Sequence, residues 1–273
     1  MPYSAYINII EKDISHYLAN LKADNSLLEP IKYALQSGGK RIRPQLMFAS
    51  AEINGIDFAD IRPLALALEC VHSYSLIHDD LPAIDNSDTR RGKPTIHKAF
   101  GEGMAVLAGD ALLNCAMEIL FDAVRKKPYL IQAAQLLASK AGISGMIGGQ
   151  ALDIGLSKEN AQGATVQTMS ALKTGALFEY ALSAPCLIPQ QLPSFADFSN
   201  LGKRIGLIFQ ITDDLLDLKQ EQDKVTLASF YGEDWCREQL AILEKECKAI
   251  LQNYQEKGTK LAKLVHKIVY RSI

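Results

Sequence analysis

Apolar residues recur at intervals of three and four along most of the chain, the spacing that places them on one face of an α-helix. The first series runs through Ile7, Ile10, Ile14, Leu18 and Leu21. The same pattern predicts helices at 27–37, 44–53, 59–81, 103–126, 129–153, 165–187, 194–218, 233–256 and 259–271. Alternating patterns typical of strands are hard to find. The sequence therefore predicts an all-α protein of roughly ten helices, longer than the usual three turns.

The breaks between these predicted helices are short, and no low-complexity tract occurs. None resembles a long linker between domains. A chain of 273 residues can bury a substantial core as one large domain. We therefore expect a single domain that spans residues 1–273.

The composition is that of an ordinary globular protein, with 48% apolar and 22% charged residues and a net charge of -2. This balance gives no reason to expect binding to nucleic acid or to an anionic membrane surface. Five scattered cysteines are typical of reduced thiols in a cytosolic protein. Asp110 and Glu118 interrupt the longest apolar run, at 103–121, which argues against a membrane span. We expect a cytoplasmic location.

Two acidic clusters follow apolar segments. The first contains Asp79, Asp80 and Asp85, and the second contains Asp213, Asp214 and Asp217. Two carboxylates 4 Å apart repel by about 4 kcal/mol at an effective dielectric of 20, and a divalent cation would reverse that sign. Oxygen ligands suit Mg²⁺, which is often shared with substrate phosphates. A solvated helix end would explain either cluster alone, but two clusters in similar settings favour a Mg²⁺ site.

Short basic segments accompany the acidic clusters. "GGKRIRP" at 38–44 contains Lys40, Arg41 and Arg43 behind two glycines, and "DTRRGKP" at 88–94 contains Arg90 and Arg91. Basic runs of this length usually lie on a solvated surface. Together with the aspartates, however, they indicate a pocket for more than one diphosphate.

In six ordered segments the chain resembles the trans-type isoprenyl diphosphate synthases, most closely their bacterial farnesyl members. These segments are "GGKRIRP", "ALECVHSYSLIHDDLPAIDNSDTRRGKPT", "FGEGMAVLAGDAL", "GMIGGQALD", "KTGALF" and "GLIFQITDDLLD". The resemblance implies the isoprenoid synthase fold, a helical bundle in which the two aspartate motifs face each other across a central active-site cavity. It also implies a homodimer.

The resemblance further implies the roles of single residues. Three Mg²⁺ ions would be held on the allylic diphosphate by Asp79, Asp85 and Asp213, with additional or water-mediated contacts from Asp80, Asp214 and Asp217. Lys40, Arg43, His72 and Arg91 would bind isopentenyl diphosphate, and Arg90, Lys173 and Lys224 would contact the allylic diphosphate. Oxygens of Thr174 and Gln210 would stabilise the developing cation.

By the same resemblance the reaction is a head-to-tail condensation of isopentenyl diphosphate with dimethylallyl and geranyl diphosphate. Tyr74, five residues before Asp79 and followed by Ser75, would form the floor that stops chain growth at farnesyl diphosphate. An ordinary core tyrosine would fit the same place. Geranyl and geranylgeranyl products therefore stay open.

The resemblance weakens after Asp217, where the segment that contains Lys224 fits only loosely and a loop is shortened. The C-terminus keeps Arg271 but lacks a further basic residue. One rival hypothesis is an HD-type metal phosphohydrolase that uses the His78-Asp79 pair, although it leaves the second cluster unexplained. A terpene cyclase would not need the isopentenyl diphosphate site. A non-catalytic regulatory subunit of a prenyl synthase would be expected to lose motif aspartates, and all six are present.

Overall fold

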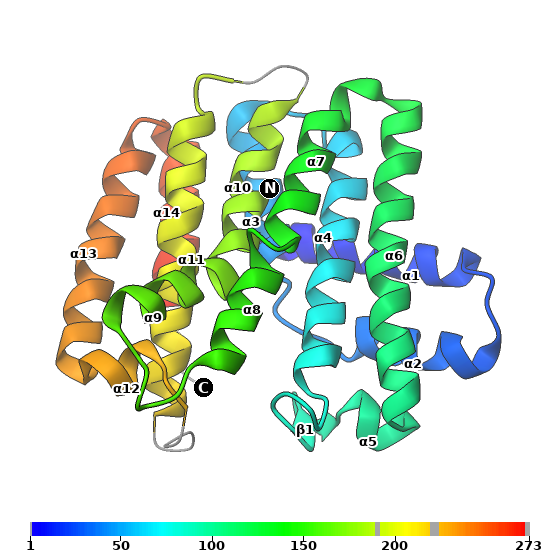
Figure 1. Ribbon diagram of the computed structural model, residues 1–273. Coiled ribbons are helices and arrows are strands. Elements are labelled where there is room, and N and C mark those ends of the chain that lie inside the picture. Colours follow the sequence, from blue (N-terminus) through cyan, green and yellow to red (C-terminus); the bar gives the residue numbers. More distant parts are fainter. Residues whose placement is uncertain (1, 189–191, 219–223, 271–273) are drawn as a thin grey trace. The chain divides into compact units, whose positions relative to one another are not determined.

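The computed structural model describes residues 2–188, 192–218 and 224–270, and helices form nearly all of the regular structure there (Figure 1). The all-α prediction is confirmed. The chain divides into two compact units. Unit 1 comprises Met1–Phe48 and Asp57–Ala134, and unit 2 comprises Ala49–Ile56 and Gln135–Ile273. The expectation of a single domain stays a prediction.

Unit 1 is built from helices and one short hairpin. Its elements are α1 (Tyr3–Asn20), α2 (Asn25–Gln36), the first part of α3 (Ile42–Asn54), α4 (Phe58–Asp79), β1 (Thr89–Arg90), β2 (Lys93–Pro94), α5 (Ile96–Phe100), α6 (Glu102–Lys126), η1 (Pro128–Leu130) and the start of α7 (Ile131–Ala141). α4 packs along α6 more extensively than on any other element of this unit. Because α4 buries side chains all round its axis, it forms the centre of unit 1.

Unit 2 contains the ends of α3 and α7 and the remaining helices. These are α8 (Met146–Gly155), α9 (Gly163–Ser170), the π-helical turn η2 (Ala171–Gly175), α10 (Ala176–Ser183), η3 (Ala184–Leu187), α11 (Phe195–Asp217), α12 (Leu227–Tyr231), α13 (Glu233–Gln252) and α14 (Gln255–Val269). α10 is buried along nearly its whole length and packs on α11. The Phe178 and Phe209 rings join these two helices, with centroids 4.9 Å apart.

Aromatic rings anchor the core of unit 1 as well. The Phe48 ring lies 5.8 Å from that of Tyr6 and 5.1 Å from that of Phe58, measured between centroids. Asp57 begins α4 by accepting a hydrogen bond of 2.9 Å from the backbone N–H of Ala59. These contacts fix the start of the helix whose far end carries the first aspartate cluster.

Three local predictions need correction. The predicted helix at 129–153 is interrupted between α7 and α8, where the backbone N–H of Gly145 donates to the carbonyl of Gly142 at 3.0 Å and closes a turn. The region 165–187 is a helix whose middle turn is π-helical. β1 and β2 pair antiparallel through two residues each, which is too short for an alternating pattern to reveal.

α6 is the one helix in the described residues that is long and apolar enough to cross a bilayer by length and composition. The apolar window has a mean hydropathy of 1.6, and 39% of it is buried. The helix nevertheless packs along α4 in the manner of a core helix.

Candidate active site

The first aspartate cluster lies where α4 ends and the chain turns back on it. The backbone N–H of Asp85 donates to the carbonyl of Asp79 at 2.9 Å, and that of Ser87 donates to the carbonyl of Asp80 at 3.2 Å. These bonds satisfy carbonyls that a helix end leaves without partners. They also bring Asp85 beside Asp79, and both residues are partly exposed. Two aspartates six residues apart in sequence are therefore joined through their backbones at one end of unit 1.

The middle aspartate of this cluster has a different environment. Asp80 is only 3% exposed, and its carboxylate accepts hydrogen bonds of 2.9 and 2.7 Å from the guanidinium of Arg90. Such bonds between charged groups are stronger than neutral ones. Arg90 belongs to strand β1, so the ion pair fastens the hairpin to the end of α4. Asp80 thus positions a cation that the sequence predicted as a diphosphate contact.

The two basic segments meet in unit 1. The Arg91 guanidinium donates to the carbonyl of Gly38 and lies over Gly39, where a Cβ atom would stand 2.7 Å from Nη1 of Arg91. Gly39 has a φ of +134°, which also favours glycine. The paired glycines therefore allow an arginine of one segment to lie directly against the other. Lys40, the next residue, is exposed.

His72 joins this basic group from α4. Its Nε2 lies 3.3 Å from Nη1 of Arg43. Burial, and then the positive charges of Arg43, Arg91 and Arg90, lower the pKa of His72 well below its usual value. The imidazole is therefore neutral near pH 7 and can accept a hydrogen bond from a cation. Unit 1 thus brings together Arg43, His72 and Arg91, and Lys40 lies exposed in the segment that precedes Arg43.

Arg41 lies in the same basic segment but is directed into the core. It is 3% exposed and donates to Glu69 at 2.6 Å, to Glu11 at 2.7 Å and to the carbonyl of Leu35 at 2.5 Å. Its charge is therefore used inside unit 1, where it fixes the segment between Lys40 and the start of α3, which carries Arg43.

The second aspartate cluster lines a small pocket of unit 2, with a volume of about 110 Å³. Asp213 and Asp217 on α11 are partly exposed there, and the exposed Lys224 lies in the segment before α12. Lys173, in the π-helical turn, reaches the same pocket and pairs with Asp153 of α8 at 2.5 Å. Carboxylates and ammonium groups thus line the same cavity.

A chain of hydrogen bonds includes Gln210 and Asp214, which line this pocket. The Thr174 hydroxyl donates to Oε1 of Gln210 at 2.5 Å, and Nε2 of Gln210 donates to Asp214 at 2.6 Å. The other oxygen of Asp214 accepts from the backbone N–H of Leu227 at 2.8 Å. Burial raises the pKa of Asp214 to about 6. Because a carboxylate accepts from the amide nitrogen, it turns the Gln210 oxygen toward Thr174.

The residues predicted to set chain length occupy one turn of α4. Tyr74 is 5% exposed, and its hydroxyl has no hydrogen-bond partner in the described structure. Burial raises its pKa to about 12. The hydroxyl of Ser75 donates to the carbonyl of His72 at 2.9 Å, which turns it toward its own helix. Tyr74 therefore presents a bulky side chain inside unit 1, whereas Ser75 does not.

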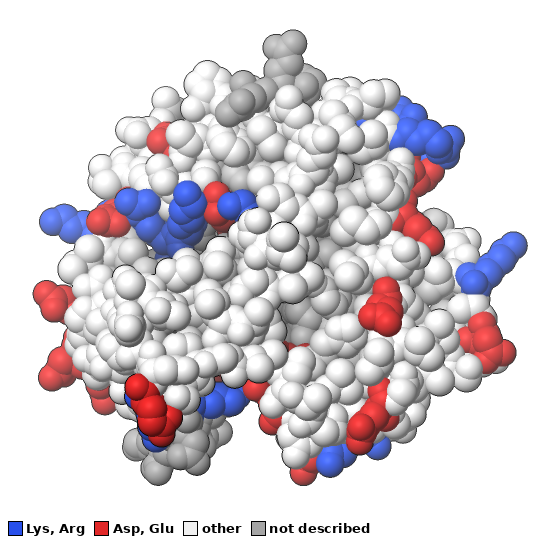
Figure 2. All heavy atoms as spheres, viewed as in Figure 1, with Lys and Arg blue, Asp and Glu red and all other residues white. Residues whose placement is uncertain are grey.

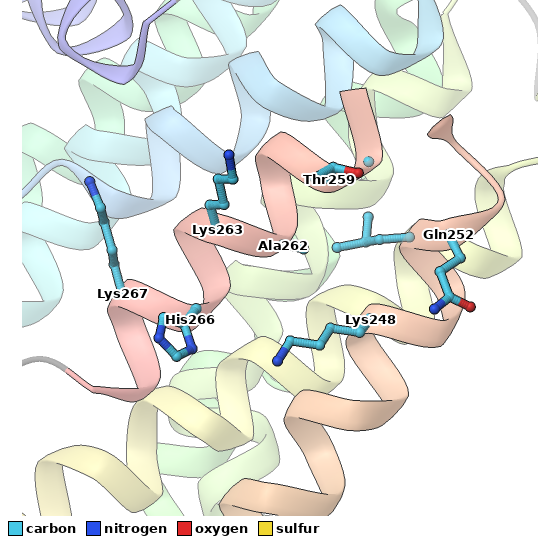
Figure 3. Close-up of a pocket in the computed structure, with 9 residues that line it drawn as sticks. Lys248, Gln252, Thr259, Ala262, Lys263, His266 and Lys267 are labelled. Atoms are coloured by element: carbon cyan, nitrogen blue, oxygen red, sulfur yellow. The ribbon is translucent and has the colours of Figure 1, made fainter. Parts of the chain in front are cut away.

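A groove of unit 2 that is distinct from this pocket lies between α13 and α14 (Figure 3). It has a volume of about 540 Å³ and is lined in part by Lys248, Lys263, His266 and Lys267. Figure 3 shows Lys248 and His266 extending toward each other from the two helices. None of the predicted site residues lines this groove. Elsewhere charges are mixed, and the face in Figure 2 carries only small groups of either sign.

Comparison with known proteins identifies the family. The family model described as polyprenyl synthetase matches residues 24–267. The farnesyl diphosphate synthase of Escherichia coli is 40% identical over 231 residues, which cover 81% of this chain and 75% of the relative. The geranylgeranyl diphosphate synthase of Cyanophora paradoxa is 37% identical over 265 residues, covering 90% and 88%. This chain belongs to the polyprenyl synthetase family.

A solved structure agrees with this membership. The geranyltransferase of Legionella pneumophila superposes with a TM-score of 0.93 at 33% identity and covers 99% of this chain and 96% of its own. The family resemblance drawn from the six segments is therefore confirmed, and with it the isoprenoid synthase fold. Like its relatives, this polyprenyl synthetase family member is a transferase.

The phosphohydrolase hypothesis has no support in this family member. Nε2 of His78 donates to the carbonyl of Val106 at 3.1 Å, so this ring nitrogen is engaged within the protein. Among the described residues, no three His, Cys, Asp or Glu side chains converge to hold a metal ion. Mg²⁺ in phosphate chemistry uses one or two carboxylates and substrate oxygens, so the motif aspartates do not need to form such a group.

Sequence reasoning missed three features of the site. Asp153 was present in the segment "GGQALD", but its pairing with Lys173 depends on how α8 packs against η2. The π-helical turn that carries Lys173 and Thr174 has no signature in the sequence. The burial of Arg41 was also not predicted. Arg271 lies outside the described residues.

Proposed function

We propose that this enzyme is a farnesyl diphosphate synthase that condenses isopentenyl diphosphate head-to-tail with dimethylallyl and then geranyl diphosphate. The observation that carries the proposal is shared by both units: motif aspartates lie beside lysines or arginines, Asp80 beside Arg90 in unit 1 and Asp213 and Asp217 in a pocket with Lys173 and Lys224 in unit 2. Relatives named farnesyl diphosphate synthase support it. Diphosphates bound through metal ions and cations require this combination of charges.

The carboxylates of both clusters fit Mg²⁺, because it prefers oxygen ligands and is readily shared with phosphates. We assign Asp79, Asp85 and Asp213 as ligands of three ions held jointly with substrate. When bound, Mg²⁺ neutralises charge on the departing diphosphate. Asp80 and Asp214 already accept protein hydrogen bonds, so they act mainly by orienting Arg90 and Gln210. Asp217 supplies a further contact from the same helix face as Asp213.

The basic group of unit 1 would bind isopentenyl diphosphate. Lys40, Arg43 and Arg91 supply the charge, and Nε2 of neutral His72 accepts a hydrogen bond from the Arg43 guanidinium. Arg90 would contact the allylic diphosphate, together with Lys173 and Lys224 of the unit 2 pocket. Fixed cations of this kind hold both substrates before the reaction begins.

In the reaction, the allylic C–O bond breaks and its electron pair leaves with diphosphate. The double bond of isopentenyl diphosphate then forms the new C–C bond, and a proton leaves for the departing diphosphate. Oxygens of Thr174 and Gln210 would face the positive charge, with the Gln210 amide kept in one orientation by Asp214. The chain therefore needs no nucleophilic side chain, but it must exclude water from the cation.

The farnesyl product depends on Tyr74. Its buried aromatic ring lies more than one helical turn before Asp79 and would meet the growing chain. A geranylgeranyl product is the second candidate, because a relative of 37% identity is named geranylgeranyl diphosphate synthase.

A coupled assay for released diphosphate tests the reaction class. Purified enzyme with isopentenyl and dimethylallyl diphosphate should release diphosphate only when both substrates and Mg²⁺ are present, and EDTA should stop the release. Release from dimethylallyl diphosphate alone would indicate hydrolysis. No release from folded protein would favour the regulatory-subunit hypothesis.

We further propose that two copies associate through α6. Val106, Leu107 and Phe121 on this helix are 41%, 53% and 69% exposed. Apolar surface of this kind is typical of an interface between subunits. Light scattering should give twice the 30.0 kDa chain mass for the wild type and the single mass for Phe121→Asp. Ile154→Asp, at an exposed position on α8, is the control and should leave the mass unchanged.

The small-molecule diphosphates are the substrates we propose, and the cytoplasmic location and the absence of a nucleic-acid partner stay predictions from the sequence.

A further inference from the structure

His78 stands directly before the first aspartate cluster and occupies a notch on α6. The notch exists because residue 109 is glycine: a Cβ atom there would lie 2.1 Å from Nε2 of His78. On its other side the ring meets the edge of Tyr74, with centroids 5.8 Å apart and planes at 74°. Two helices and one aromatic ring thus confine the imidazole.

The ring is also held by a hydrogen bond between helices. Nε2 lies 3.1 Å from the carbonyl oxygen of Val106, and because a carbonyl only accepts, Nε2 must carry the proton. The next charged group, Asp110, is 3.9 Å away and its side chain is 63% exposed, so it adds little. The bond to Val106 therefore connects the last turn of α4 to the helix that packs along it.

This connection lies where α4 would otherwise be least constrained. Helix ends fray, and the end of α4 carries Asp79 and Asp80. The carbonyl of His78 accepts from the N–H of Leu81 at 3.2 Å, and the next two carbonyls hold the returning loop with Asp85. A rotation of the last turn would therefore displace every carboxylate of the cluster.

We propose that His78 is a positioning residue that holds the first aspartate cluster in its metal-binding geometry through the Val106 carbonyl and the Gly109 notch. The proposal rests on the proposed function for the identity of the metal site.

Variants separate the hydrogen bond from the packing. His78→Phe keeps a ring and loses the donor, whereas His78→Gln keeps an N–H donor. Gly109→Ala should expel the ring without altering it. Gly103→Ala is the matched control, because a Cβ atom there meets nothing within 4 Å on the same helix.

The primary readout is binding of Mn²⁺ in the presence of inorganic pyrophosphate, followed by electron paramagnetic resonance. Loss of a residue that orients metal ligands typically weakens affinity by about 10- to 100-fold. We expect that loss in His78→Phe and Gly109→Ala, partial recovery in His78→Gln, and wild-type affinity in Gly103→Ala. The double variant His78→Phe/Gly109→Ala should be no weaker than either single variant, because the two changes remove one contact.

Wild-type Mn²⁺ affinity in folded His78→Phe and Gly109→Ala would overturn the proposal, as would equal loss in Gly103→Ala. If His78→Phe is unfolded by circular dichroism, His78→Gln and Gly109→Ala decide the result. Failure of the wild type to condense its substrates would instead refute the proposed function, and the Mn²⁺ measurement would still report on the position of the cluster.

Discussion

Replacing Arg41 by methionine should destabilise the protein. The same replacement of Lys40, its neighbour in the basic segment, should affect substrate binding and not stability. Arg41 is 3% exposed and its guanidinium is shared by Glu69, Glu11 and a backbone carbonyl. Methionine matches the aliphatic stem of arginine and carries no charge. The substitution therefore removes the cation and leaves the apolar packing largely in place.

The magnitude follows from how each partner is buried. The Glu11 side chain is 41% exposed, so its pair with Arg41 contributes at most about 1 kcal/mol. The Glu69 side chain is 3% exposed, and removing the partner of such a buried charge costs about 3–5 kcal/mol. The loss of the pair with Glu69 therefore accounts for most of the expected loss of stability. A loss of this size is a large fraction of the roughly 5–15 kcal/mol that stabilises a typical protein.

Urea denaturation with linear extrapolation measures the free energy of unfolding. We expect a loss of about 3–5 kcal/mol for Arg41→Met and a partial recovery in Arg41→Met/Glu69→Gln, where the buried negative charge is also removed. Lys40→Met is the control. Lys40 is exposed, so the change should leave stability within about 0.5 kcal/mol and lower the affinity for isopentenyl diphosphate.

A loss below about 1 kcal/mol for Arg41→Met would refute this reasoning. It would mean that the Glu69 carboxylate finds water or another donor once the guanidinium is gone. Equal destabilisation by Lys40→Met would refute the distinction between a structural and a substrate-binding cation.

Three further predictions concern the site. Asp79→Ala and Asp213→Ala should each lower turnover by at least about 100-fold without lowering thermal stability, because each removes a metal ligand and relieves repulsion; near-normal turnover in either would exclude that ligand. Tyr74→Ala should lengthen the product beyond C15, seen by chromatography of the prenols, and an unchanged product would place the floor elsewhere. Burial and Arg43 lower the pKa of His72 below 6.5 in the folded protein. As the pH falls, His72 therefore binds a proton in the unfolded chain before it does so in the folded one. The free energy of unfolding should therefore fall as pH drops below about 6.5, and His72→Gln should reduce that slope in urea titrations; an unchanged slope would show that His72 does not cause it.

The periodicity of apolar residues predicted the long helices well, because the spacing of their buried residues follows the helical repeat. The predicted helices at 59–81 and 194–218 correspond to Phe58–Asp79 and Phe195–Asp217. The interruption between α7 and α8 was missed, because glycines within an apolar pattern are compatible with both a helix and a turn. Two-residue strands are likewise too short to show a period.

The sequence predicted which residue types gather at the site but not how each is used. Asp79 and Asp80 are adjacent in the sequence, yet only Asp80 is buried, because Arg90 reaches it from the hairpin. Asp214 differs from Asp213 in the same way, through Gln210 and the backbone of Leu227. Such differences arise from tertiary contacts, and no local pattern contains them.

Product analysis tests the central claim most directly. Purified enzyme, Mg²⁺, labelled isopentenyl diphosphate and dimethylallyl diphosphate are incubated, and the dephosphorylated prenols are separated by chromatography. We predict farnesol as the main product. Geranylgeraniol or geraniol would retain the condensation and contradict Tyr74 as the floor for a C15 product. No labelled prenol from folded protein, with allylic diphosphates of several lengths supplied, would contradict the proposed function itself.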